Sequence, residues 1–314
     1  MTLKRQKIIS LVFIVLSLIL SLQSLIYIVN LNQIVTFLHL ALWIWIYLWV
    51  VIFLLYDLHF KNPGALARAK FRHESVTHWF SRSVKITISA FWERISHLRK
   101  WQEVRQYLNY LLLPGFIFWA TVGIFYVSLG QVKLQEIYAL LSTIALGLHY
   151  WYLKETFFRH KEVVDEDVFV AMSVVKIYGI ALVYAASFVL TRRYCLEPHY
   201  FVTAVFCFSF LLIYQALFQH NLIKINTIIT TIAISAVLGV LAYFVYINWG
   251  YNYLTAAIFL AAFYNLFWAT YHYHLDKTLT AKAFFEIFLI CMLVAFLVLS
   301  NTNFKARILD GCMF

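Results

Sequence analysis

Nine apolar runs of about 20 residues each are the feature that most constrains how this chain folds. About 20 residues of α-helix span the roughly 30 Å hydrocarbon core of a bilayer, and in lipid a single segment satisfies its backbone polar groups only as a helix. The sequence therefore predicts an all-α, polytopic transmembrane helix bundle of about nine spans, forming one integral membrane domain over residues 1–314. The runs cover about residues 8–29, 34–56, 107–129, 134–153, 168–191, 199–218, 225–247, 251–271 and 283–300.

The composition indicates that lipid is the solvent. Of the 314 residues, 63% are hydrophobic and only 12% are charged, whereas a soluble domain carries about 25% charged residues. With only 9 Gly and 3 Pro, long unbroken helices are expected. The net charge of +11 does not indicate a nucleic-acid partner, because no nucleic-acid-binding motif accompanies it.

The distribution of basic residues predicts the orientation of the chain. If the N-terminus is cytoplasmic, nineteen of the 25 Lys and Arg lie on the cytoplasmic side, five lie outside and Lys176 lies inside a span. Loops rich in Lys and Arg stay in the cytoplasm. We therefore expect a multi-pass protein of the cell (inner) membrane, with a cytoplasmic N-terminus and an external C-terminus.

The one long polar segment, residues 57–106, separates the second and third runs. Its apolar residues recur at steps of three and four from Val76 to Leu98, with basic residues at other positions. This pattern predicts an amphipathic helix lying on the cytoplasmic leaflet, with anionic lipid headgroups as its partners. Besides anchoring, such a helix could serve as a lid or a substrate platform.

Nine of the eleven histidines fall on the predicted cytoplasmic side, and each run that leads inward ends near one. Helices ending at one level would bring His149, His220 and His272 together, with the carboxylate of Asp276 or Asp57. Such ligands suit iron or zinc. Heme held by two histidines, either His39 with His199 or His149 with His272, is a further alternative. The simpler interpretation is that these side chains mark the membrane–water interface.

The eighth run carries a polar stripe at its end. His272 and Asp276 are four residues apart and share a helix face, to which Asn265 and Trp268 also belong. His274 is two residues from His272 and points elsewhere. A polar stripe of this kind should face protein and not lipid.

Lys176 lies inside the fifth run, where an unpaired charge is costly. Glu286, at the start of the ninth run, is a candidate partner from the same side. The alternative is a lysine that reaches the membrane surface from the margin of its span.

Small residues recur every fourth position in the seventh run, at Thr227, Thr231, Ser235 and Gly239. Such a row favours close packing against another helix, and the alternative is a polar permeation stripe.

The four cysteines divide into two kinds. Cys207 and Cys291 lie within runs, whereas Cys195 and Cys312 both fall on the predicted outer side. A disulfide between Cys195 and Cys312 would be permitted in an oxidising compartment.

The leading functional hypothesis from these patterns is a metal-dependent membrane enzyme, an oxidoreductase acting on a lipid or isoprenoid. Its expected metal ligands are His149, His220, His272 and His274, and its expected catalytic residues are Asp276, Lys176 and Glu286. One alternative is a transporter or channel with Lys176, Glu286 and Asn265 along a polar path. Another is a structural subunit of a membrane complex, as part of a homo- or hetero-oligomer.

Overall fold

A computed structural model describes residues 3–60, 92, 101–158, 166–219, 222–250 and 252–302. Within these residues the chain forms nine helices, as predicted from the nine apolar runs. They are α1 (Leu3–Asn30), α2 (Ile34–Phe60), α5 (Trp101–Val127), α6 (Val132–Phe158), α7 (Glu166–Arg193), α8 (Pro198–Gln219), α9 (Ile225–Asn248), α10 (Tyr253–Leu275) and α11 (Ala281–Asn301).

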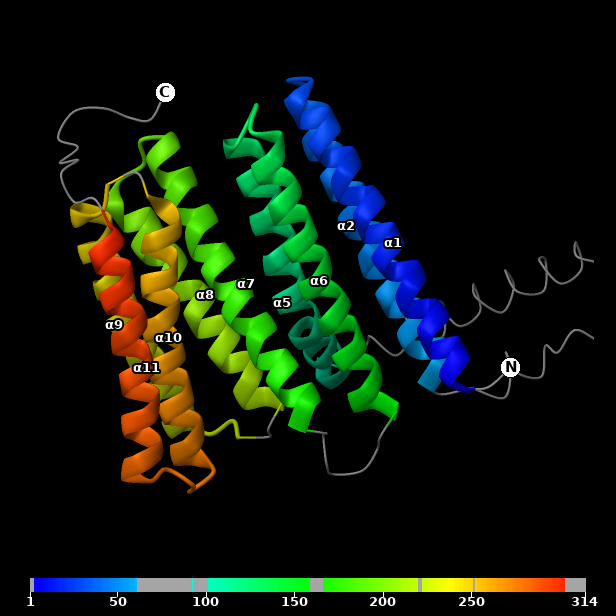
Figure 1. Cartoon of the computed structure of the whole chain (residues 1–314). Helices are drawn as coiled ribbons and strands as arrows, with labels where there is room; N and C mark the ends of the chain where they lie inside the picture. The colour runs from blue at the N-terminus through cyan, green and yellow to red at the C-terminus, as the bar shows by residue number, and fades with distance from the viewer. Residues whose placement is uncertain are drawn as a thin grey trace, which may run out of the picture.

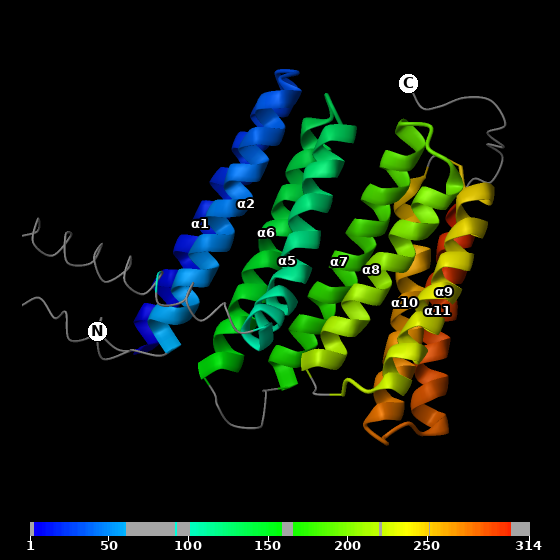
Figure 2. The same ribbon diagram turned by 180° about the vertical axis from the view of Figure 1, so that it is seen from behind.

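The helices run alternately up and down in one bundle (Figures 1 and 2). We call the end at which α1 begins and α10 ends the proximal end, at the bottom of Figure 1. The opposite end, at which α7 ends and α8 begins, is the distal end. Helix α7 is central to the bundle, because it packs against α5, α6, α8 and α10.

Six of the described helices are long and apolar enough to cross a membrane, so the chain is an integral membrane protein. The apolar segments of α2 and α5, Ile34–Leu48 and Leu111–Val127, are shorter within the described residues. Helix α6 is not among the six, and polar residues such as Gln135 and Ser142 lower the hydropathy of its described part. Nine helices are thus observed, while a count of nine spans stays a prediction.

The predicted interfacial segment, residues 57–106, lies mostly outside the described residues. Helix α2 continues to Phe60 and α5 begins at Trp101, so both helices extend into this segment. Between them only Trp92 is described, and it is helical and exposed. The amphipathic helix on the leaflet therefore stays a prediction.

Helices α8 and α9 pack through the small-residue row predicted for this purpose. Thr227, Thr231 and Ser235 are buried, and a Cβ on Gly239 would lie 3.5 Å from Val202 of α8. Because small side chains let two backbones approach closely, the row is a packing face in this structure and not a permeation stripe.

Hydroxyl groups connect the central helices. Thr121 of α5 donates to the carbonyl of Ile117 and bonds to Ser142 of α6, at 2.7 Å. Ser142 in turn bonds to the hydroxyl of Tyr178 on α7, at 2.9 Å. In lipid, such bonds between helices supply association that the hydrophobic effect does not provide.

The distal end holds an amide pair, the half-buried Asn30 and the buried Gln135. The Asn30 amide donates to Oε1 of Gln135 at 2.6 Å and accepts from the backbone N–H of Gly130 at 3.0 Å. Gln135 also donates to the carbonyl of Phe125. Gly130 has φ +78, a conformation that favours glycine. The pair therefore joins α1 to the turn between α5 and α6.

Two arginines at the end of α7 complete the distal end. Arg192 donates to the carbonyls of Tyr246 and Trp249, at the end of α9, and its guanidinium lies 4.1 Å from the centre of the Tyr246 ring. Arg193 donates to the carbonyl of Val127, the last residue of α5. Cations are stabilised at helix C-termini, where carbonyls lack helical partners.

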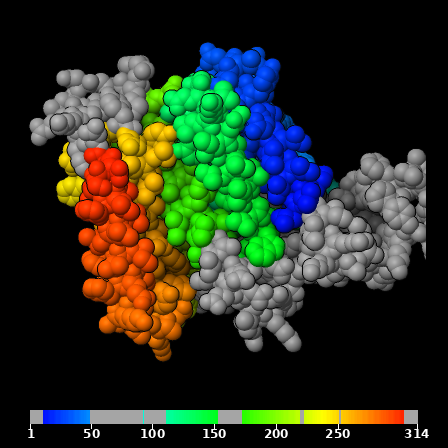
Figure 3. Space-filling model, viewed as in Figure 1, coloured from blue at the N-terminus to red at the C-terminus, as the bar shows by residue number. Residues whose placement is uncertain are grey.

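Helix α11 lies at the edge of the bundle (red and orange in Figure 3). It packs on α10 through Cys291, Ala295 and Val298. Its other face exposes large apolar side chains, among them Phe285 and Phe296. This face is suited to lipid contact.

Candidate functional site

The polar stripe predicted at the end of α10 is present. His272 Nδ1 lies 3.2 Å from Oδ2 of Asp276. The ring centre of His272 lies 5.4 Å from that of Trp268, in an edge-on arrangement. Asn265, one turn further along this face, is half-buried. The prediction that His272 and Asp276 share a face is confirmed.

The backbone after α10 holds Asp276 in place. Lys277 has φ 58, and its N–H bonds to the carbonyl of His274, while the N–H of Thr278 bonds to the carbonyl of Tyr273. These two bonds close a Schellman turn, with Lys277 in the position that glycine usually takes. His274 is exposed and points away from the stripe, as predicted.

Lys176 of α7 lies close enough to His272 for their charges to interact. Its side chain is half-buried, at an interface between two spans. Lys176, His272 and Asp276 thus form one group, which we call the α7–α10 cluster. In it two ionisable side chains from α10 lie within electrostatic range of a third from α7.

Glu286, the candidate partner of Lys176, is placed elsewhere. It is exposed on α11 and lies 3.9 Å from Lys282 of the same helix. Helix α11 packs on α10, whereas α7 packs on α5, α6, α8 and α10 and not closely on α11. The charge of Lys176 therefore acts on His272, and the described residues show no ion pair between Lys176 and Glu286.

His149 lies at a different interface from His272. It is buried on α6 and lines a pocket of about 20 Å³ together with residues of α1, α2 and α5. These include Trp45 and Pro114. A volume of this size accommodates about one water molecule. His149 and His272 are thus not brought together, either for a metal or as a heme pair.

The predicted metal site is incomplete among the described residues. His220, its third ligand, lies outside them. In the part of the chain that is described, no group of three or more His, Cys, Asp or Glu side chains could hold a metal ion.

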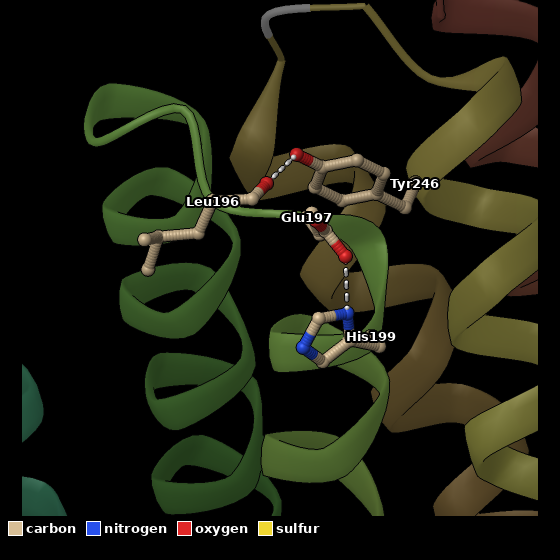
Figure 4. Close-up of polar contacts among 4 residues, drawn as sticks. All are labelled: Leu196, Glu197, His199 and Tyr246. Atoms are coloured by element: carbon tan, nitrogen blue, oxygen red, sulfur yellow. Dashed lines mark hydrogen bonds and ion pairs between the residues drawn. The ribbon is translucent and has the colours of Figure 1, made fainter.

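The two distal histidines each have a local partner. His199 Nδ1 lies 2.9 Å from Oε2 of Glu197, at the start of α8 (Figure 4). Beside them the Tyr246 hydroxyl donates to the carbonyl of Leu196. His39 is exposed on α2, with its ring nitrogen 2.8 Å from the carbonyl of Val35. These arrangements give no support to a heme between His39 and His199.

Cys195, between the end of α7 and the start of α8, is disulfide-bonded, while Cys207 and Cys291 are free. Its predicted partner, Cys312, lies outside the described residues.

Sequence reasoning missed the distal arginines as structural residues. Arg192 and Arg193 entered only the charge count, although adjacent cations at the end of a span are a signal for carbonyl capping. The amide pair of Asn30 and Gln135 carried no local signal, because 105 residues separate its members.

The α7–α10 cluster is able to hold and move protons. The contact of Asp276 with Nδ1 orients the imidazole and leaves Nε2 directed into the protein, where that atom is buried. An imidazole oriented by a carboxylate donates at one nitrogen and accepts at the other. The neighbouring ammonium of Lys176 disfavours a positive charge on the His272 imidazole, whereas the carboxylate of Asp276 favours it.

Comparisons of the chain with protein-family models, with curated proteins and with solved structures find no match.

Proposed function

We propose that this integral membrane protein is a transport protein that moves protons, with the α7–α10 cluster as its proton-carrying site. One observation supports this proposal above all others. The charge of a half-buried lysine on one span acts on a histidine–aspartate pair of another span, across the interface of α7 and α10. Ionisable groups in such positions are costly, and they typically mark ion paths and proton relays.

The other described polar groups of the interior suit this function less well. The hydroxyl series of Tyr178, Ser142 and Thr121 ends on the backbone carbonyl of Ile117. A carbonyl has no proton to pass on, so this series joins helices and does not conduct. In the α7–α10 cluster, by contrast, all three side chains can change charge.

Proton flux into reconstituted vesicles tests the proposal. The protein is placed in liposomes that contain a pH-sensitive dye, and a potassium diffusion potential set by valinomycin drives protons inward. We expect flux above that of protein-free liposomes, and a several-fold loss in Lys176→Met and in His272→Gln. Lys282→Met is the matched control, because Lys282 is an exposed lysine outside the cluster. Wild-type protein that conducts no better than empty liposomes would refute the proposal.

The second candidate is the metal-dependent oxidoreductase acting on a lipid or isoprenoid. The oriented imidazole of His272 supports it, since a ligand histidine is often held by a carboxylate at its other nitrogen. Its metal would need His220 and further ligands beyond the described residues. Metal analysis of the purified protein separates the candidates. About one zinc or iron per chain, lost in both His220→Ala and His272→Ala, would favour the enzyme.

A further inference from the structure

We propose that the α7–α10 cluster exchanges protons with water at the proximal end only, through Asp276, and that Tyr184 and Tyr264 close the route toward the distal end. This inference deepens the proposed function and rests on it. It assigns Asp276 as the group that takes protons from water, and it assigns two tyrosines to the seal.

Exposure falls from Asp276 into the protein. The side chain of Asp276 is 43% exposed and that of His272 is 16% exposed. Asp276 also begins a turn, residues 276–280, in which every residue is exposed. Water therefore reaches the carboxylate directly. It reaches the imidazole past Asp276, or when neighbouring side chains move slightly.

The geometry allows one balanced step between these groups. In the tautomer that carries its hydrogen on Nε2, Nδ1 of His272 is free to accept: a proton from hydronium binds a carboxylate oxygen of Asp276, and it then passes from Oδ2 to Nδ1 across the 3.2 Å contact, which leaves a carboxylate and an imidazolium. One O–H bond breaks and one N–H bond forms, and the reverse step returns the proton to water. Lys176 of α7 is the charge outside α10 that acts on His272. His274 and Lys277, next to Asp276 along the chain, and the Lys282–Glu286 pair of α11 are exposed to solvent, which screens them.

Toward the distal end, the interface of α7 and α10 is closed. Leu260, Ala261 and Tyr264 of α10 are at most 4% exposed, and Ile180 and Tyr184 of α7 are fully buried. Tyr264 lies close to Tyr184. Large aromatic side chains packed at this density leave no room for a file of water.

The polar group within this seal does not bypass it. The Tyr184 hydroxyl bonds to Ser209 of α8 at 2.6 Å, and Ser209 donates to the carbonyl of Val205. This short series leads sideways into α8 and ends on a backbone carbonyl. The structure therefore corresponds to a state that is open at the proximal end and closed at the distal end.

Cysteine labelling from the two sides of the membrane tests the inference. Each variant is made in a background in which Cys207 and Cys291 are replaced by Ser, and it is treated with a membrane-impermeant maleimide in vesicles of both orientations. The test positions are Asp276→Cys and Ala261→Cys, at the entrance and in the seal. Gln131→Cys is the control, because Gln131 is exposed in the distal turn between α5 and α6.

We expect Asp276→Cys to react from one side, Gln131→Cys from the opposite side, and Ala261→Cys from neither until the protein is denatured. Three results would each overturn the inference. They are Ala261→Cys reacting from the Gln131 side, Asp276→Cys and Gln131→Cys reacting from the same side, and Asp276→Cys failing to react.

The labelling and the proton flux separate the two levels of the proposal. Flux in the wild type combined with distal labelling at Ala261→Cys removes the seal but leaves the proton-transport function. Absence of flux in the wild type removes the function, and the assignment of Asp276 as a proton entrance with it. Loss of flux in Asp276→Asn, alongside the expected labelling, supports both.

Discussion

Arg192 is the side chain for which the largest single-residue effect on stability is expected. It satisfies two carbonyls at the end of α9 and lies against the ring of Tyr246. Charged hydrogen bonds contribute about 1.5–3 kcal/mol, and a partly desolvated cation–π contact adds about 1–2 kcal/mol. Arg192→Met should therefore lower the free energy of unfolding by about 3 kcal/mol, measured as a lower Tm in detergent.

Lys133→Met is the matched control for this prediction. Lys133 is also a distal cation, but it is exposed. Equal losses of stability in the two variants would show that net charge, and not carbonyl capping, determines the effect.

Ser235 is a residue whose polar atom contributes nothing to stability. Its hydroxyl is buried and has no hydrogen-bond partner among the described residues, and a buried group of this kind is unfavourable. We expect Ser235→Ala to leave the Tm unchanged or to raise it. Thr121→Val, which removes a buried hydroxyl with two partners, should cost about 1–2 kcal/mol. A Ser235→Ala variant that is the less stable of the two would contradict this account.

At the scale of helices, close packing of α7 on α5 depends on Gly179. A Cβ at this position would lie 2.8 Å from Leu113 Cδ1 and 3.1 Å from Ile117 Cγ1, both in fully buried side chains. Overpacking of this kind costs about 1–3 kcal/mol. Gly179→Ala is therefore expected to lower the Tm, whereas Gly239→Ala, whose Cβ would meet Val202 at 3.5 Å, should be tolerated. Two variants of equal stability would exclude a special role for the contact at Gly179.

The helices were predictable because lipid leaves a spanning segment few other conformations. Their bounds agree with the apolar runs to within a few residues, except where α1, α2, α5 and α6 extend into polar sequence. Partners across interfaces were harder to predict. Sequence position gives the depth of Lys176 and Glu286 in the membrane. It does not show whether α7 and α11 are neighbours, or toward which helix each side chain points. Depth alone therefore suggested a pair that the packing does not form.

The same limitation applies to the histidines. His149 and His272 end their helices at the same predicted level, yet one faces α1, α2 and α5 while the other faces Lys176 of α7. Contacts within one helix were more secure, because the helical repeat fixes them. The helical repeat fixes both the pairing of His272 with Asp276 and the shared face of the small-residue row on α9.

At the scale of the whole molecule, we expect the distal end to face an oxidising compartment. The charge count predicts an external C-terminus, and Cys195 at the distal end is disulfide-bonded. Since Cys207 and Cys291 are free, Cys312 is the partner that remains in the sequence. Mass analysis under non-reducing conditions should find the peptides of Cys195 and Cys312 joined. A C-terminal reporter should be active only outside the cytoplasm, and activity inside would reverse the orientation.

The uneven distribution of bonds between the two ends has a mechanical consequence. Distal contacts of Asn30, Arg192 and Arg193 fasten helix ends to one another, whereas the proximal bond between α9 and α10, from Tyr271 to Thr227, is long at 3.4 Å. From the contacts of the described residues, we expect the bundle to pivot at its distal end. Lys176 lies 17 residues from Arg193, the distal end of α7, or about 26 Å at 1.5 Å per residue, so a tilt of about 5° moves it by about 2 Å. Such a rotation would change the separation of Lys176 and His272, and the distal hydrogen bonds would set its energetic cost.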